Sequence, residues 1–287
     1  MPESRQRLVR LEARTAWIYA EHTILGRHED QLTLVRDHDT LIVPSGTLGA
    51  VMLGPGTSVT HPGMDLLAEN CVTLLWVRGG GLGVFHTSTP PSFTRGSSPV
   101  RAQARVVSDP ELRLAAAREM YSHRFPGGVP GDTLQAMMQA EGVRVKARYR
   151  ELSEQFGVHW KRRGPGQESD LINRNLDYVN HMIYGVCEVV TGALGLSAGL
   201  GIVHEGNARA FIFDLADLYK SEVAPVAFQA TAEGLTDASE LRARIRTWVW
   251  ENKLFNRAID DVARILKVRG ETVSLVDTQT WWDGESA

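Results

Sequence analysis

The chain has 287 residues, of which 43% are hydrophobic and 23% are charged, as in ordinary globular proteins. Its formal net charge of −3 excludes a protein whose whole surface is basic, so any binding of nucleic acid must rest on a local patch. No apolar run approaches the roughly 20 residues that span a bilayer, and the charged start of the chain lacks the apolar centre of a signal peptide. Cys71 and Cys187 lack metal-ligand spacing and are typical of a reducing compartment. We therefore expect a cytoplasmic protein with no membrane association.

Residues 1–88 are predicted to form a β-rich domain. Short apolar runs such as "QLTLV", "TLIVPS" and "VTLLWV" are separated by turn residues, and one short helix, "GMDLLAENC", interrupts them. This pattern predicts an antiparallel β-sandwich or a small barrel, of which we favour the sandwich. Residues 89–99 are rich in Ser, Thr and Pro without periodicity, so they are predicted to be a linker.

The chain changes to a helical period after the linker, which predicts an all-helical domain over residues 100–270. Helical patterns cover residues 110–125, 132–157, 170–195, 214–234 and 238–268. The apolar runs "GLGIV" and "ARAFIF" on either side of "HEGN" predict a small β-hairpin within this domain. Residues 271–287 are predicted to be a tail. The predicted fold class is therefore α+β.

Glu141 is an unexpected carboxylate in the helix predicted from Asp132. The apolar stripe of that helix contains Leu134, Met138, Val145, Tyr149 and Leu152, and Glu141 falls at its missing step. A buried carboxylate is costly unless it is paired or binds a metal. Glu141 alternatively lies at the margin of the stripe and pairs with Arg144 or Arg148. Gly142, which follows it, indicates a close approach of another part of the chain.

A histidine and two aspartates form a second candidate group. Taken singly, His204 is typical of a turn, and Asp214 and Asp217 are typical of an N-cap and a first helical turn. Taken with Glu141, they make an oxygen-rich set with one imidazole, which suits Mg²⁺ or Mn²⁺. Such a site favours phosphoryl chemistry.

The segment from Glu141 to Arg163 is basic in an acidic chain. It holds seven basic residues against three acidic ones, with Trp160 directly before "KRR". Basic residues with an interleaved aromatic suit phosphate contact and base stacking. A solvated helix face is the alternative. The predicted DNA-binding residues are Arg144, Lys146, Arg148, Trp160, Lys161, Arg162 and Arg163.

Longer motifs occur in a fixed order from about residue 10 to residue 265. They are "VMLGPGTSVTH", "LLWV", "LQAMMQAEGVRVKARYRELSEQFGVHW", "IYGVCEVV", "GIVHEG" and "FIFDLADLYKSEVAPVAF". Through them the chain resembles the CRISPR-associated spacer integrase, the universal integrase subunit of CRISPR adaptation, and within that family its type I-E branch. Tyr184, in "IYGVCEVV", is added to the predicted DNA-binding residues.

The resemblance implies a site, a reaction and partners. It places the catalytic metal ligands at Glu141, His204 and Asp217, with Asp214 as an accessory acid. It implies that the β-rich domain forms a homodimer, that the helical domain is catalytic, and that a small second CRISPR adaptation protein bridges two dimers. The implied reaction is attack by the 3′-hydroxyl ends of short captured double-stranded DNA on a phosphodiester of the CRISPR repeat. With water as the nucleophile, the same site would act as a DNA endonuclease.

Two departures from relatives concern the DNA ends rather than the chemistry. The aromatic residue that caps the end of the DNA duplex has no clear counterpart near residues 19–22, and Asn207 follows "HEG" where a relative has a basic residue. A metal-dependent nuclease that acts alone on branched DNA, and a DNA-binding scaffold without catalysis, remain alternatives.

Overall fold

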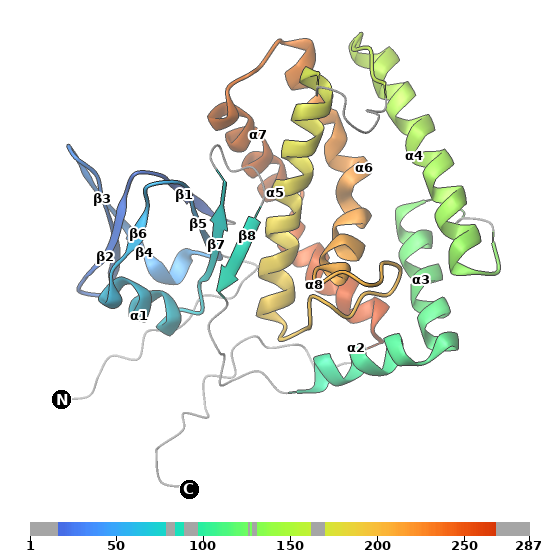
Figure 1. Cartoon of the computed structure of the whole chain (residues 1–287), viewed down its shortest axis with the longest axis horizontal. Coiled ribbons are helices and arrows are strands. Elements are labelled where there is room, and N and C mark those ends of the chain that lie inside the picture. Colours follow the sequence, from blue (N-terminus) through green and yellow to red (C-terminus); the bar gives the residue numbers. More distant parts are fainter. Residues whose placement is uncertain are drawn as a thin grey trace, which may run out of the picture.

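The computed structural model describes residues 17–78, 84–88, 97–125, 127, 131–161 and 170–267. A strand-rich part lies beside a larger helical part (Figure 1). Residues 89–96 of the predicted linker, residues 268–270 and the predicted tail at 271–287 lie outside the described residues. Among the helices that are described, none is long and apolar enough to cross a membrane.

The N-terminal part contains two four-stranded sheets. The first has the order β1-β5-β7-β8, formed by Ile18–Ala20, Ala50–Leu53, Thr73–Val77 and Val84–Ser88. The second has the order β4-β3-β2-β6, formed by Thr40–Pro44, Gln31–Val35, Ile24–His28 and Ser58–Val59. Both sheets mix parallel and antiparallel pairs, so the predicted purely antiparallel arrangement was wrong in this detail. The short predicted helix is present as α1 (His61–Glu69), and its Leu66 and Leu67 belong to the same hydrophobic core as the strands of the second sheet.

Strand β5 is buried on both faces, and this connects the two parts of the protein. Side chains alternate across a strand. Val51 and Leu53 therefore face the core between the two sheets, while Ala50 and Met52 face the helical core. Helix α5 (Leu171–Ala193) approaches this second face closely, because a Cβ on Gly185 would lie 3.3 Å from the Cε of Met52.

The helical part is confirmed as a bundle around α5 and α6. Helix α6 comprises Ala210–Ala232, and the helices packed around this pair are α2 (Ser98–Ser108), α3 (Pro110–Arg124), α4 (Leu134–Phe156), α7 (Ala238–Glu251) and α8 (Leu254–Ile265). Side-chain caps fix several starts: Asp109 accepts from the backbone N–H of Leu112, and Thr133 from that of Ala136. Helix α4 ends at Gly157, whose φ of 64° is left-handed.

Two of the predicted elements were wrong. The hairpin around "HEGN" is absent, because residues 201–209 form a loop and "AFIF" begins α6. Helix α6 is buried on nearly all sides, and a continuous apolar run does not distinguish a buried helix from a strand by period. The helix expected over residues 238–268 is broken into α7 and α8 at Lys253, which has a φ of 48°.

Candidate metal centre

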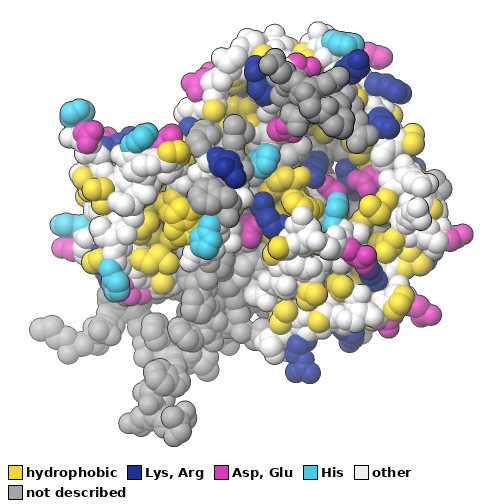
Figure 2. Space-filling view, viewed as in Figure 1, with side chains coloured by type: hydrophobic (Ala, Val, Ile, Leu, Met, Phe, Trp, Pro, Cys, Tyr) yellow, Lys and Arg dark blue, Asp and Glu magenta, His cyan; other side chains and the backbone are white. Residues whose placement is uncertain are grey.

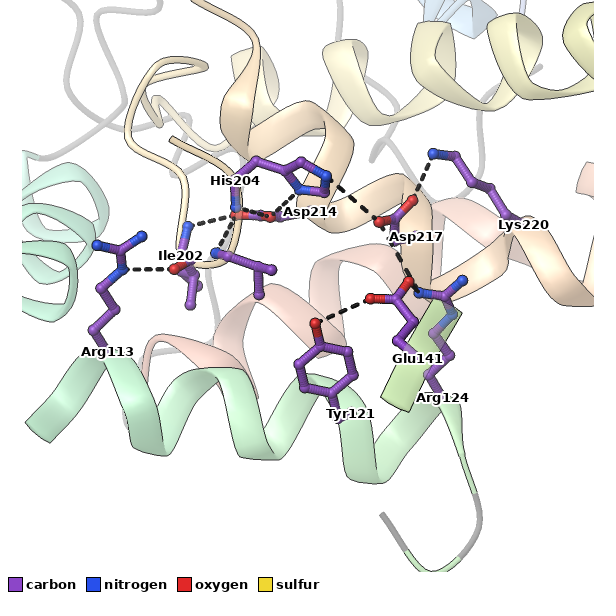
Figure 3. A network of polar contacts seen from close by, with 10 residues as sticks. Arg113, Tyr121, Arg124, Glu141, Ile202, His204, Asp214, Asp217 and Lys220 are labelled. Atoms are coloured by element: carbon purple, nitrogen blue, oxygen red, sulfur yellow. Dashed lines mark hydrogen bonds and ion pairs between the residues drawn. The ribbon is translucent and has the colours of Figure 1, made fainter. Parts of the chain in front are cut away.

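Three helices and one loop meet at a small cleft in the helical part. Its lining includes Tyr121 and Arg124 from α3, Glu141 from α4, and Asp214 and Asp217 from α6. The loop that precedes α6 carries His204 to the edge of this cleft, where its Nε2 lies 3.9 Å from Oδ2 of Asp217 (Figure 3). On the face of the helical part seen in Figure 2, basic, acidic and histidine side chains lie close together. The structure thus brings Glu141, His204 and Asp217 into one neighbourhood.

Asp214 folds the loop that carries His204. Its carboxylate accepts hydrogen bonds from the backbone N–H groups of Ile202, Val203 (3.1 Å) and His204 (2.9 Å). The side chain is fully buried. Asp214 lies in the second turn of α6, so its predicted role as an N-cap was wrong. These hydrogen bonds tie the backbone of residues 202–204 to α6.

Other residues fix the same loop from outside α6. Buried Gln103 of α2 donates to the carbonyls of Ser197 (2.9 Å) and Leu200 (3.0 Å), and its own carbonyl accepts from the N–H of Ser197. Arg113 of α3 donates to the carbonyl of Ile202 at 2.6 Å. Gly201 has no room for a side chain, since a Cβ there would collide with the carbonyl oxygen of His204. The loop is therefore rigidly built around the position of His204.

The imidazole of His204 is oriented by the same aspartate. Its Nδ1 lies 2.7 Å from Oδ1 of Asp214, which makes Nδ1 the protonated nitrogen of the neutral ring and leaves the lone pair of Nε2 facing Asp217. The hydrogen bond to Asp214 raises the pKa of His204. Histidines that bind metals usually donate their other N–H to a carboxylate in this manner. In the described geometry, Asp214 therefore supports His204 and has its own oxygens occupied.

Glu141 is partly buried and is held by two residues of α3. Its Oε2 accepts from the Tyr121 hydroxyl at 3.0 Å, and its Oε1 pairs with Arg124. Burial and the charge of Glu141 raise the pKa of Tyr121, so the phenol stays a donor. Arg148, one of the two partners proposed from the sequence, instead pairs with Glu151 at 3.2 Å.

The apolar stripe of α4 is shifted from its predicted course. Met137 is buried and Met138 is 43% exposed, so the stripe reaches Glu141 from Met137, four residues earlier. The close approach expected at Gly142 was also wrong, because a Cβ added there would meet nothing within 4 Å.

Asp217 lies between two cations. Its Oδ1 pairs with the Lys220 ammonium at 2.5 Å, and its Oδ2 lies 4.0 Å from the guanidinium of Arg124. Burial opposes the charge on Lys220, but Asp217 and Tyr184 outweigh it and raise the pKa of Lys220 to about 12. Each of the two cationic side chains therefore contacts Asp217 through a single nitrogen–oxygen pair.

The donor atoms fit a hard divalent cation, although they do not surround one. Glu141 and Asp217 offer carboxylate oxygens, and His204 offers the lone pair of Nε2. Mg²⁺ and Mn²⁺ prefer oxygen ligands, and Mn²⁺ also accepts imidazole. Within the described ranges, no three such side chains already stand at metal-binding distances from one another. The Arg124 guanidinium lies between Glu141 and Asp217 and is within ion-pair distance of both carboxylates.

Tyr184 of α5 borders the centre through Lys220 and an aromatic neighbour. The Nζ of Lys220 lies 4.7 Å from the centroid of the Tyr184 ring. The rings of Tyr184 and Phe213 pack edge to face at 5.1 Å, and Phe213 in turn lies 5.9 Å from the ring of His204. These contacts form a wall beside the donor atoms.

The basic segment has a mixed outcome. Lys146 and Lys161 are exposed, and Arg144 lies 5.3 Å from the centroid of the Phe125 ring. The ring of Trp160 packs edge to face on that of Tyr149, with centroids 5.0 Å apart, and is partly buried against the hydrophobic core. Arg162 and Arg163 lie outside the described residues.

Sequence reasoning missed Tyr121, Arg124 and Lys220. Arg124 ends α3, where a basic residue is usually explained by the helix dipole. Lys220 follows Asp217 by three residues, and this helical spacing is the one signal that would have identified it. Tyr121 reaches Glu141 only through tertiary packing.

Comparison with known proteins identifies the family. The family model of the CRISPR associated protein Cas1 matches residues 16–127 and 129–246. A CRISPR-associated endonuclease Cas1 of Clostridium sp. (strain SY8519) is 32% identical, over 96% of this chain and 93% of the relative. Another, from Thermus thermophilus, is 34% identical, over 89% of this chain and 80% of the relative.

A solved structure agrees with this result. The crystal structure of a TtCas1–DNA complex superposes with a TM-score of 0.80 at 31% identity, covering 94% of this chain and all of that one. The agreement extends over both the strand-rich and the helical part. The chain belongs to the family of the CRISPR-associated protein Cas1.

Proposed function

We propose that this protein is a metal-dependent DNA integrase of CRISPR adaptation. It joins the 3′-hydroxyl ends of short captured DNA to the CRISPR repeat by transesterification. The observation that carries the proposal is that Glu141 and Asp217 flank one guanidinium cation and His204 lies beside Asp217, in a chain whose relatives are CRISPR-associated endonucleases.

Glu141, His204 and Asp217 would hold one Mg²⁺ or Mn²⁺ ion. When bound, such an ion supplies positive charge at the reacting phosphate and favours ionisation of the attacking hydroxyl. The chain's own residues do the remainder. Asp214 holds the His204 ring with Nε2 facing Asp217, and Tyr121 holds the second oxygen of Glu141. Lys220 adds a fixed positive charge beside Asp217, suited to a phosphate oxygen.

The reaction needs no external energy source. The oxygen of the 3′-hydroxyl forms a bond to phosphorus, the bond from phosphorus to the repeat's own 3′ oxygen breaks, and the proton of the attacking hydroxyl ends on the leaving oxygen. One phosphodiester is lost and one is made. With water as the nucleophile, the same steps give hydrolysis and hence endonuclease activity.

The DNA would follow basic residues near the centre. Arg144, Lys146 and Arg148 of α4 and exposed Lys161 supply positive charge, and Arg162 and Arg163 belong to the same proposed track. Phosphate contacts of this kind position DNA without reading its sequence. The DNA in the related TtCas1 complex supports DNA as the partner of this chain as well. Tyr184 lies at the edge of the centre, where it would contact the reacting strand.

The assembly proposed for this chain is a homodimer bridged to a second dimer by a small CRISPR adaptation protein. The strand-rich part offers an apolar surface for self-association: Ile24 and Ile42 lie on the same face of the sheet that contains β4, β3 and β2, and each is 50% exposed. Hydrophobic side chains are also visible on this part in Figure 2. Apolar surface exposed in this manner commonly marks protein interfaces.

A strand-joining assay tests the proposal. Purified protein is incubated with a short duplex, a repeat-containing plasmid, the small partner protein and Mn²⁺, and joined products are counted with and without chelator. Joining that requires Mn²⁺ and the partner supports the integrase. Cleavage of branched DNA without partner or repeat would favour the stand-alone nuclease, and DNA binding without either reaction would favour the scaffold.

A further inference from the structure

Arg124 is bound where the proposed metal would be. Its NH1 nitrogen pairs with Oε1 of Glu141 and lies 4.0 Å from Oδ2 of Asp217. That same Oδ2 lies 3.9 Å from Nε2 of His204. Two of the proposed donor atoms, on Glu141 and Asp217, therefore border the position of one guanidinium nitrogen, and His204 approaches the same Asp217 oxygen from the opposite side (Figure 3).

The guanidinium is buried but incompletely satisfied. The Arg124 side chain is 5% exposed, and its Nε finds no hydrogen-bond partner within the described part of the chain. Its Cζ lies 5.0 Å from the centroid of the Phe125 ring. A buried arginine normally has most of its five donors paired. Arg124 is thus held by its ion pair and hydrogen bond to Glu141, while its Nε donor remains without a partner among the described residues.

The charges around the site predict different behaviour for Arg124 and for Lys220 when a metal ion binds. Glu141 and Asp217 are balanced by Arg124 and Lys220 when no metal is bound. Adding a divalent ion at the shared position would place two positive charges against the guanidinium at contact distance, where repulsion is strong. Lys220 pairs with the other oxygen of Asp217, away from that position, and has no need to move.

We propose that Arg124 is an internal counter-ion that fills the metal position in the metal-free protein and leaves it when Mg²⁺ or Mn²⁺ binds. The side chain neutralises Glu141 and Asp217 during folding and competes with the metal afterwards. This inference rests on the proposed metal centre. It assigns Arg124 two effects, since the side chain stabilises the metal-free protein and lowers the affinity for the metal.

Mn²⁺ titration by calorimetry, without DNA, tests the inference. The variants are Arg124→Gln, which removes the charge, and Arg124→Lys, which keeps a cation of different shape. Arg118→Gln is the matched control, since Arg118 lies on the same helix, is 52% exposed and pairs with Asp132. The melting temperature of each protein is measured with and without metal.

Removal of the Arg124 charge should raise the affinity for Mn²⁺ and lower the stability of the metal-free protein. Arg124→Gln should bind Mn²⁺ roughly tenfold more tightly. The apparent dissociation constant equals the intrinsic constant divided by the fraction of protein in which Arg124 has left the metal position. A fraction of about one in ten in the wild type is enough to give this difference. The melting temperature of Arg124→Gln without metal should fall, and its gain on adding Mn²⁺ should exceed that of the wild type. Arg124→Lys should lie between the two, and Arg118→Gln should match the wild type.

The outcomes separate this inference from the proposed function. Equal or weaker Mn²⁺ binding by Arg124→Gln, with a wild type that binds, overturns the competing role of Arg124 and leaves the metal centre intact. Failure of the wild type and of every variant to bind Mn²⁺ overturns both. If Arg124→Gln does not fold, Arg124→Lys decides, and an unchanged dissociation constant for that variant counts against the inference.

Discussion

The two sides of the metal centre are held in different ways. On the His204 side, Asp214 is fully buried and accepts three backbone N–H groups as well as the imidazole. On the Glu141 side, carboxylates of the same chemical type are held by side-chain cations and one phenol. Backbone donors are fixed by the fold, whereas a side-chain cation such as Arg124 is free to leave. The His204 side is therefore a scaffold, and Arg124 on the Glu141 side is the cation proposed to exchange for a metal.

The largest effect is expected from breaking the scaffold side with Asp214→Asn. An amide has one accepting oxygen in place of two and turns an N–H₂ group toward buried donors. Each buried polar group left without a partner costs about 1–3 kcal/mol, so unfolding should become easier by about 3 kcal/mol or more. Urea denaturation measures this, and strand joining should be lost as well. A variant as stable as the wild type would show that the loop does not depend on Asp214.

Asp217→Asn should separate chemistry from folding. The amide oxygen still accepts from Lys220, and Arg124 retains Glu141, so stability should fall by only about 1 kcal/mol. Strand joining should fall by roughly a hundredfold to a thousandfold, as when one group that stabilises transition-state charge is removed. The two measurements are urea denaturation without metal and the joining assay. Substantial joining by this variant would remove Asp217 from the proposed ligands.

His204→Ala should reduce strand joining only in part, and excess Mn²⁺ should restore it. The variant keeps Glu141 and Asp217 but loses one ligand, so its affinity for Mn²⁺ falls while its capacity to react remains. Excess metal offsets weak binding by mass action. Joining is measured as a function of Mn²⁺ concentration, with Asp217→Asn in parallel. No recovery at any concentration would assign His204 a different role, such as proton transfer.

The smallest effect is expected from Tyr121→Phe. The substitution removes one hydrogen bond to Glu141 and leaves the ring in place, which should cost about 1 kcal/mol of stability. Mn²⁺ affinity should fall by about tenfold, at the low end of what the loss of an outer hydrogen bond to a metal ligand causes. Calorimetry and urea denaturation give both numbers. A complete loss of joining would mean that the phenol contacts the substrate directly.

The sequence predicted those parts of the centre that have a local signal. Glu141 falls near an apolar stripe, and Asp214 and Asp217 share one helix face, so periodicity marked them as candidates but left their ion-pair and helix-start alternatives open. Arg124 and Tyr121 reach Glu141 from another helix, and no local pattern encodes that contact. The loop before α6 was mistaken for a hairpin because its glycines and apolar residues suit both structures.

The double burial of strand β5 has a consequence for taking the protein apart. Ala50 and Met52 belong to the core of the helical part, and Val51 and Leu53 belong to the core of the sheets. A fragment that ends before the helices would present Met52 and Leu75 to water, and a fragment without the strands would strip the cover from α5. A one-residue insertion in β5 would exchange the two sets of side chains between the cores. The strand-rich part and the metal centre are therefore expected to unfold as one cooperative unit.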